Sequence, residues 1–294
     1  MRKAFLPVLL ALMLLLGACA AQKPAEPARL RVTATFAPIA LLAKEVIGGV
    51  GDVSLETMAP AQAGCLHDYQ LTMNDRRLLE KSDVLLACGA GMETFLDSVR
   101  TDHPGLKVCE AAAGYPLIPS VTGETYWNAH LWMSAEGAAW MADAIAACLG
   151  QADPDHAEEY ARNAAAFAEK ALALRDEYAG KLAGIPNRHI VIFHESFDYT
   201  ARDFGLEVVG VIAKEPDEEP TAKELNDVIA AVKQYGVPAL FADAQYDDRA
   251  AQTVSQETGA ACSTVDSLVS ADPAQTDYLT VMRQNYETLT EALR

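Results

Sequence analysis

The feature that most constrains the fold is an alternation of short β-branched segments with longer amphipathic segments, which occurs twice along the 294-residue chain. In the first series, RLRVTATF, VSLETMAP, DVLLACG and LKVCEA are expected strands, and amphipathic segments such as APIALLAKEVIG are expected helices. A second series begins at His189 with IVIFH and continues through LEVVGVI, ALFADA and ACSTV. Such alternation is typical of parallel sheets flanked by helices. The chain is therefore predicted to be an α/β protein with two lobes.

One long amphipathic segment, residues 153–184, lies between the two series. Its apolar side chains recur every three or four positions, and Asp153 and Pro154 suit the start of a helix. About thirty residues at 1.5 Å each would form a rod of roughly 45 Å. We therefore expect one rigid helix to join two lobes, which would cover residues 30–150 and 187–294.

The N-terminus has the layout of a bacterial lipoprotein signal. MRKAFLPVLLALMLLLGAC contains two basic residues, a short apolar segment and then LGAC, which looks like a lipobox. The apolar segment is too short for a comfortable membrane span. We expect a signal peptide over residues 1–18, lipidation of Cys19, and a Pro/Ala-rich tether over residues 19–29. The folded body would then be anchored at the outer face of the cytoplasmic membrane.

The charge excludes one large class of partners. The chain has 23 Lys and Arg residues against 41 Asp and Glu residues, a formal net charge of -18. Nucleic-acid surfaces depend on lysine and arginine, so no nucleic-acid partner is expected. An acidic surface fits attraction of cations, although it is also typical of plain solubility.

Apart from Cys19, the cysteines are odd in number and show no CxxC spacing. Most of them lie in or beside predicted strands and helices, where a free cysteine behaves as a small buried apolar residue. We therefore expect no disulfide framework among Cys65, Cys88, Cys109, Cys148 and Cys262.

Three of the six histidines share a position in the predicted fold, because each lies where an element ends. His67 follows the strand VSLETMAP, His130 precedes a helix, and His194 ends the strand IVIFH. Ligand sites of parallel α/β sheets gather at such ends. The other three are not expected in a site: His103 lies in a turn, His156 in the first turn of the long helix, and His189 faces away from His194.

Three converging imidazoles predict a metal site. Borderline metals bind neutral imidazole nitrogen, and a carboxylate can complete four-coordination. Asp266, which ends the last strand of the second series, is the expected carboxylate. Asp243, which ends the neighbouring strand, is its rival.

The same segments carry a family resemblance. AGCLHDYQLTMNDRRLLEKSDVLLACGAGME resembles the GxxPHxYEPTPSD segment and the ADLVVYNGLGLE continuation of metal-binding solute-binding lipoproteins of bacterial ABC importers. WNAHLWMS resembles their DPHVWLDP, and IVIFHESFDYTARDFGLEVVGV and STVDSL resemble their third-ligand and final-aspartate segments. The resemblance runs from about Leu30 to the C-terminus. It implies that His67 and His130 from one lobe, and His194 and Asp266 from the other, hold zinc, manganese or iron(II) between the lobes.

The chain departs from the family pattern beside two of these histidines. Cys65 and Leu66 replace a small residue and proline, and Asn128 and Ala129 replace aspartate and proline. Cys65 is two residues before His67 in the sequence and could therefore lie near the metal. Three histidines and a carboxylate already fill a tetrahedral coordination shell, however, so Cys65 is not expected as a ligand. Glu195, beside His194, is interpreted either as a hydrogen-bond acceptor behind the ligands or as a surface residue.

The expected function is capture of a divalent metal outside the membrane and delivery to an ABC permease and its ATPase, by a monomer. A zinc hydrolase is the alternative, but HExxH, GxSxG and Walker A motifs are missing, so no enzyme is expected. An adhesin is a third class, for which the sequence encodes no receptor site.

The sequence favours zinc as the metal, with manganese or iron(II) as the alternative. Three nitrogens and one carboxylate suit zinc, which also exceeds manganese in intrinsic affinity for such a site. Manganese importers of the family commonly have a glutamate where this chain has His194. Many zinc members carry a histidine-rich loop before the second ligand, and residues 111–129 contain no histidine.

Overall fold

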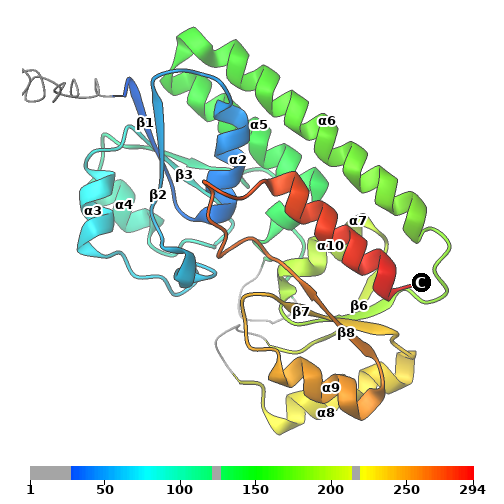
Figure 1. The fold of residues 1–294 in the computed structure, drawn as a ribbon. Coiled ribbons are helices and arrows are strands. Elements are labelled where there is room, and N and C mark those ends of the chain that lie inside the picture. The colour runs from blue at the N-terminus through cyan, green and yellow to red at the C-terminus, as the bar shows by residue number, and fades with distance from the viewer. Residues whose placement is uncertain (1–27, 121–126, 214–218) are drawn as a thin grey trace, which may run out of the picture.

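The computed structural model describes residues 28–120, 127–213 and 219–294. The expected signal peptide, Cys19 and nearly all of the tether lie outside these ranges. The described chain forms two four-stranded parallel sheets with helices on both faces, so the predicted α/β class with two lobes is confirmed (Figure 1). In the described ranges, no helix combines the length and the apolar character that crossing a membrane requires.

The N-terminal sheet has the strand order β2-β1-β3-β4. Helix α2 covers one face, and α3 and α4 cover the other (Figure 1). Helix α2 ends at Gly48, which has a φ of 53°, a conformation that favours glycine. The elements are β1 (Leu30–Ala34), α2 (Ala37–Ile47), β2 (Val53–Thr57), α3 (Met73–Leu79), β3 (Val84–Ala87), α4 (Leu96–Asp102) and β4 (Lys107–Glu110).

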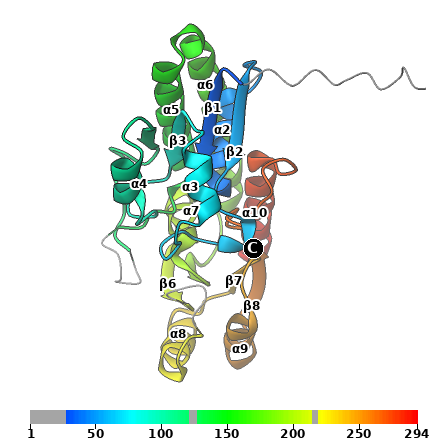
Figure 2. The same cartoon turned by 90° about the vertical axis from the view of Figure 1, so that its left-hand side faces the viewer.

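The C-terminal sheet has the strand order β6-β5-β7-β8. Helices α8 and α9 cover its outer face, while α7 and α10 lie on the face toward the rest of the molecule (Figures 1 and 2). A capping box formed by Thr221 and Glu224 opens α8. The elements are β5 (His189–Ile192), α7 (Asp198–Asp203), β6 (Glu207–Val211), α8 (Ala222–Tyr235), β7 (Ala239–Asp243), α9 (Arg249–Thr258), β8 (Ala261–Val265) and α10 (Tyr278–Ala292).

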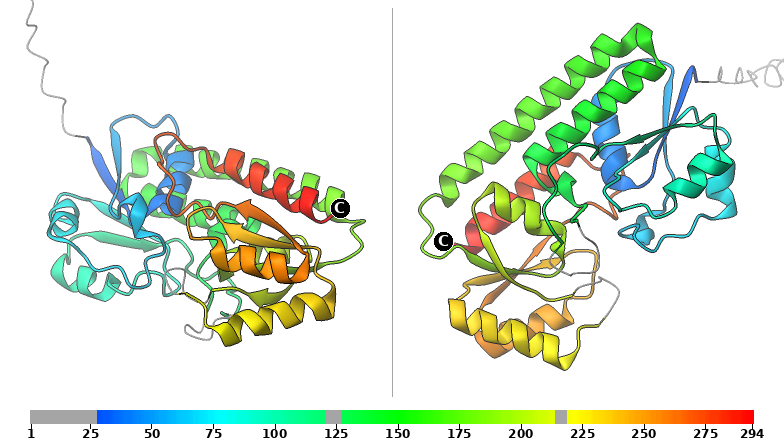
Figure 3. Two further views of the ribbon diagram at one scale, coloured as in Figure 1. Left: turned by 60° about the horizontal axis from the view of Figure 1, so that its bottom comes forward. Right: turned by 180° about the vertical axis from the view of Figure 1, so that it is seen from behind.

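The link between the sheets consists of two helices, α5 (Ala135–Ala152) and α6 (Ala157–Leu182). Helix α6 packs along α5 and also contacts α2 and α10, so it runs beside both lobes (Figures 1 and 3). It begins later than predicted, because Pro154 lies in a separate 3₁₀ turn. The Asp153 side chain caps neither helix and instead accepts a 2.8 Å hydrogen bond from the Tyr160 hydroxyl. The limits proposed for the two lobes stay a prediction.

The two lobes share one apolar core. A single cluster of buried side chains includes residues of β1, β3 and α2 from the first lobe and of β5, β7 and α10 from the second. A smaller cluster lies beneath α8 and α9. Because packed interiors resist deformation, the shared core keeps the facing ends of the two sheets at fixed positions relative to each other.

One expectation about the cysteines is wrong. Cys109 at the end of β4 and Cys148 in α5 form a disulfide, with their Cα atoms 6.4 Å apart. They are separated by 39 positions and lie on different kinds of element, so no short spacing marks the pair. Cys88 is buried, as expected, and its thiol lies 3.3 Å from the carbonyl oxygen of Ala129.

Candidate metal centre

The three predicted histidines are delivered by loops at the facing ends of the two lobes. His67 lies between the 3₁₀ turn Ala61–Ala63 and α3. His130 immediately precedes the 3₁₀ turn Leu131–Met133, which leads into α5. His194 follows β5 by two residues and precedes another short turn. Each histidine therefore lies in a short segment that adjoins a helix, strand or 3₁₀ turn on at least one side, which restrains the position of its ring.

These loops bring the three rings together. The ring centroids of His67 and His130 are 5.8 Å apart, and those of His130 and His194 are 5.0 Å apart. His130 and His194 are 0% and 3% exposed, and His67 is half-buried. The convergence of His67, His130 and His194 predicted from the sequence is thus present, with His130 in the middle.

Burial favours the neutral form of the His67 and His130 imidazoles. It lowers the pKa of His130 well below its ordinary value, and repulsion from His194 and His67 lowers it further. Burial also lowers the pKa of His67, against the opposing effect of Asp68. A neutral imidazole keeps a nitrogen lone pair for a cation, so the electrostatics of the cluster suit metal binding.

Asn128 fixes which nitrogen of His130 is available. Its Oδ1 accepts hydrogen bonds from the His130 backbone N–H at 2.9 Å and from Nδ1 at 3.0 Å. Its Nδ2 donates to the Glu195 carbonyl oxygen at 2.8 Å and to Asp198 Oδ2 at 3.2 Å. Since the amide oxygen can only accept, Nδ1 carries the proton and Nε2 holds the lone pair. This is the arrangement typical of a metal-binding histidine and its supporting acceptor.

Cys65 also reaches the cluster. Its Sγ lies 3.3 Å from His130 Nε2. Within the described ranges, Cys65, His130 and His194 are the one group of three candidate metal ligands whose donor atoms all lie within 4.8 Å of one another. The expectation that Cys65 stands near the histidines therefore agrees with the geometry.

Asp266 and Asp243 lie at the same end of the C-terminal sheet. Asp266 is half-buried, and its Oδ1 accepts a 2.7 Å hydrogen bond from the Leu268 N–H. Asp243 is buried, which raises its pKa to about 6, and the nearby charge of Asp266 also raises it. Neither carboxylate joins the close donor group found in the described residues.

A contact between the lobes links Asp266 to the histidines. The Trp132 ring lies 5.1 Å from that of His130, and its Nε1 donates to the Ser267 carbonyl oxygen at 3.0 Å. Ser267 directly follows Asp266. The expected carboxylate is thus connected to the cluster through its neighbour, and its role as a ligand stays a prediction.

The histidines that were not expected in the site lie elsewhere. His189 stacks near Tyr235, with ring centroids 4.9 Å apart. His156 pairs with Asp153, its Nδ1 lying 3.1 Å from Oδ2. His103 ends α4 and is partly exposed.

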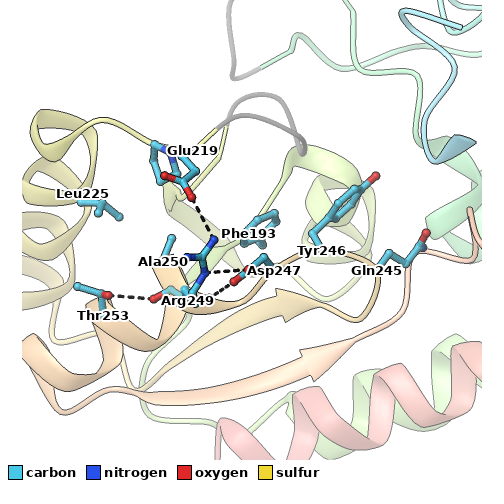
Figure 4. A pocket seen from close by; sticks show the side chains of 10 residues that line it. Phe193, Glu219, Leu225, Gln245, Tyr246, Asp247, Arg249, Ala250 and Thr253 are labelled. Carbon is cyan, nitrogen blue, oxygen red and sulfur yellow. Dashed lines mark hydrogen bonds and ion pairs between the residues drawn. The ribbon is translucent and has the colours of Figure 1, made fainter. Parts of the chain in front are cut away.

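A separate pocket of about 480 Å³ lies in the C-terminal lobe, and no histidine lines it (Figure 4). Its Arg249 is neutralised by Glu219 at 3.0 Å and Asp247 at 2.8 Å (Figure 4). Phe193 and Tyr246 stack there with ring centroids 5.8 Å apart. Because the opposite charges in this pocket are already paired, it has little electrostatic attraction for a cation or an anion. The histidine cluster is therefore the candidate metal site.

Comparison with known proteins agrees with this geometry. The family model described as zinc-uptake complex component A, periplasmic, matches residues 32–292. The chain belongs to this family. The zinc-binding protein AdcA of Streptococcus pyogenes is 28% identical over 288 residues, which cover 89% of this chain and 55% of AdcA. The chain thus spans about half the length of that curated relative.

Two further similarities are to proteins that are named for other roles. The iron-binding protein YfeA of Yersinia pestis is 30% identical over 249 residues, covering 83% of this chain and 79% of YfeA. The structure of the laminin-binding adhesin of Streptococcus agalactiae superposes with a TM-score of 0.81 at 27% identity, covering 90% of this chain and all of the adhesin chain. The two-lobe fold is therefore that of metal-binding solute-binding proteins of this family.

The structure explains one departure from the family pattern and corrects one interpretation. Asn128, in place of the family's aspartate, performs the acceptor role toward His130. Glu195 is 3% exposed and its Oε2 accepts a 2.6 Å hydrogen bond from Ser120, so the interpretation of Glu195 as a surface residue is wrong. The role of Asn128 was missed, because its place two residues before a histidine does not by itself mark a supporting acceptor in a metal site.

Proposed function

We propose that this protein is the extracytoplasmic substrate-binding component of an ABC importer. It captures a divalent transition metal and delivers it to a permease that is driven by its ATPase. The observation that carries the proposal is the convergence of three imidazoles from both lobes at one point, two of them buried and the third half-buried. Family membership and the metal-binding roles for which AdcA and YfeA are named support it.

The proposed ligands are His67, His130, His194 and Asp266. The proposed cargo is zinc, because nitrogen donors predominate, and manganese or iron(II) is the alternative. A catalytic zinc site keeps an open position for water and substrate. His130 and His194 are almost fully enclosed, which favours a carrier, so we propose no enzymatic activity.

Zinc titration of the purified protein against a chelator of known affinity tests the site. Replacing His67, His130 or His194 singly by alanine should weaken zinc binding by about tenfold or more, since each removes one metal–nitrogen bond. His103→Ala and His189→Ala are the controls and should leave affinity nearly unchanged. Equal losses in both sets would overturn the assignment. Manganese and iron(II) in the same competition should fail to displace zinc.

We also propose that Cys19 anchors the protein. LGAC behind a short apolar segment supports lipidation, with the folded body held as a monomer at the outer face of the cytoplasmic membrane. Cells supplied with a labelled lipid precursor should tag the chain, and Cys19→Ala should abolish the tag. A Cys19→Ala protein that still carried label would contradict the lipobox interpretation.

A further inference from the structure

Cys65 differs from Cys88 and Cys262, the two other described cysteines outside the disulfide. Cys88 is buried and its Sγ faces the Ala129 carbonyl oxygen, while Cys262 lies at the far end of the C-terminal lobe, in β8. Cys65 alone of these three stands in the donor group with His130 and His194. It comes from the same loop as His67, so one loop brings an imidazole and a thiol to the cluster.

The separation of the donor atoms fits one bound ion. Zn–S bonds of about 2.3 Å and Zn–N bonds of about 2.0–2.1 Å at a tetrahedral angle put sulfur and nitrogen roughly 3.5 Å apart. Sγ of Cys65 lies 3.3 Å from Nε2 of His130, within a few tenths of that value. The facing nitrogen is also the correct one, since Asn128 holds the proton on Nδ1. A zinc ion between these atoms would need only a small widening.

Given the proposed function, on which this step rests, we propose that Cys65 is a thiolate ligand of the captured metal. We also propose that Cys65 gives the site its preference for zinc. When the metal–sulfur bond forms, the thiol proton passes to solvent, as for any cysteine ligand. The site then takes cations that accept soft donors, and discriminates against manganese and iron(II) more strongly than nitrogen and oxygen ligands would.

The sulfur and the carboxylate compete for the same position. Three imidazoles, Cys65 and Asp266 are one donor more than a tetrahedral ion accepts. Thiolate is the better partner for zinc, and carboxylate is the better partner for manganese. Asp266 Oδ1 is already held by the Leu268 N–H, whereas the sulfur faces the lone pair of His130. In this proposal Cys65 takes the fourth position in the zinc complex, in place of Asp266 in the ligand set proposed above, and Asp266 completes the complex of a harder ion.

The test combines a spectrum with two affinities. Co²⁺ replaces Zn²⁺ in tetrahedral sites and shows a near-ultraviolet charge-transfer band when a thiolate is bound. The Co²⁺-loaded protein should show this band, and Cys65→Ser should abolish it. The same variant should lose zinc affinity by about tenfold or more and manganese affinity by much less, because only the zinc complex uses the sulfur. Cys262→Ser, a half-exposed free thiol elsewhere, should change none of these.

Each outcome decides the matter. A Co²⁺ complex without the band, a band that persists in Cys65→Ser, or equal losses of zinc and manganese affinity would overturn the role of Cys65, and in these cases the metal-binding function would stand. A wild-type protein that bound none of the three metals would overturn both proposals. The wild-type spectrum needs no variant, so it decides even if Cys65→Ser folds poorly.

Discussion

His130 and His189 share the same hydrogen-bond arrangement with an asparagine two residues before them, and the side chains around each ring decide whether it can bind a metal. Asn187 Oδ1 accepts from the His189 N–H at 2.9 Å and from Nδ1 at 2.8 Å, just as Asn128 does for His130. His189 is partly exposed beside Tyr235 and Glu207, so its ring faces one aromatic ring and one exposed carboxylate and no second imidazole among the described contacts. His130 is enclosed among two other imidazoles and a thiol. An Asn-x-His pattern alone does not distinguish these cases.

This pair provides a matched experiment. Asn128→Ala should lower zinc affinity by about 10–100-fold, because the His130 ring loses the acceptor that fixes its proton and its orientation. Asn187→Ala removes the same hydrogen bonds from His189 and should leave zinc affinity unchanged. Competition titration of both variants measures the difference. Equal affinities for the two variants would show that Asn128 has no role in positioning His130.

At the scale of elements, the sequence predicted what depends on local pattern and missed what depends on assembly. The alternation of β-branched with amphipathic segments marked every strand of both sheets. The disulfide between β4 and α5 was missed, because their adjacency arises only when α5 packs on the sheet. The break at Pro154 was missed because proline is equally compatible with a first helical turn.

The candidate site divides in the same way. Positions at the ends of predicted elements selected His67, His130 and His194, since ligand sites of parallel α/β folds gather at such ends. The approach of Cys65 to His130 depends on the path of a loop that no periodicity describes. Asp243 and Asp266 both lie at the ends of neighbouring strands. Which of the two carboxylates binds the metal depends on the direction of its side chain, and the sequence pattern does not give that direction.

At the scale of the whole molecule, the site lies where the two lobes are tied to each other. The Trp132 indole N–H donates a hydrogen bond to the Ser267 carbonyl oxygen, and the Tyr278 hydroxyl donates to the Trp132 carbonyl oxygen at 2.6 Å. The Tyr199 hydroxyl donates to the Asn128 carbonyl oxygen at 2.7 Å. Together with the shared core, these bonds couple the ligand loops of the first lobe to the second. Metal bound between the loops therefore acts on the stability of both lobes.

Zinc should consequently raise the stability of the whole fold in one step. At a free zinc concentration 100 times the Kd, binding to the native state alone adds about 2.7 kcal/mol to the free energy of unfolding. For a chain of this size, that corresponds to a rise in Tm of roughly 4–5 °C. Calorimetry with buffered zinc should show a single transition that moves as a unit, and a tenfold loss of affinity in His194→Ala should remove about half of the shift. Two transitions, of which only one moved with zinc, would mean that the lobes unfold independently and that the ligands of one lobe hold the ion.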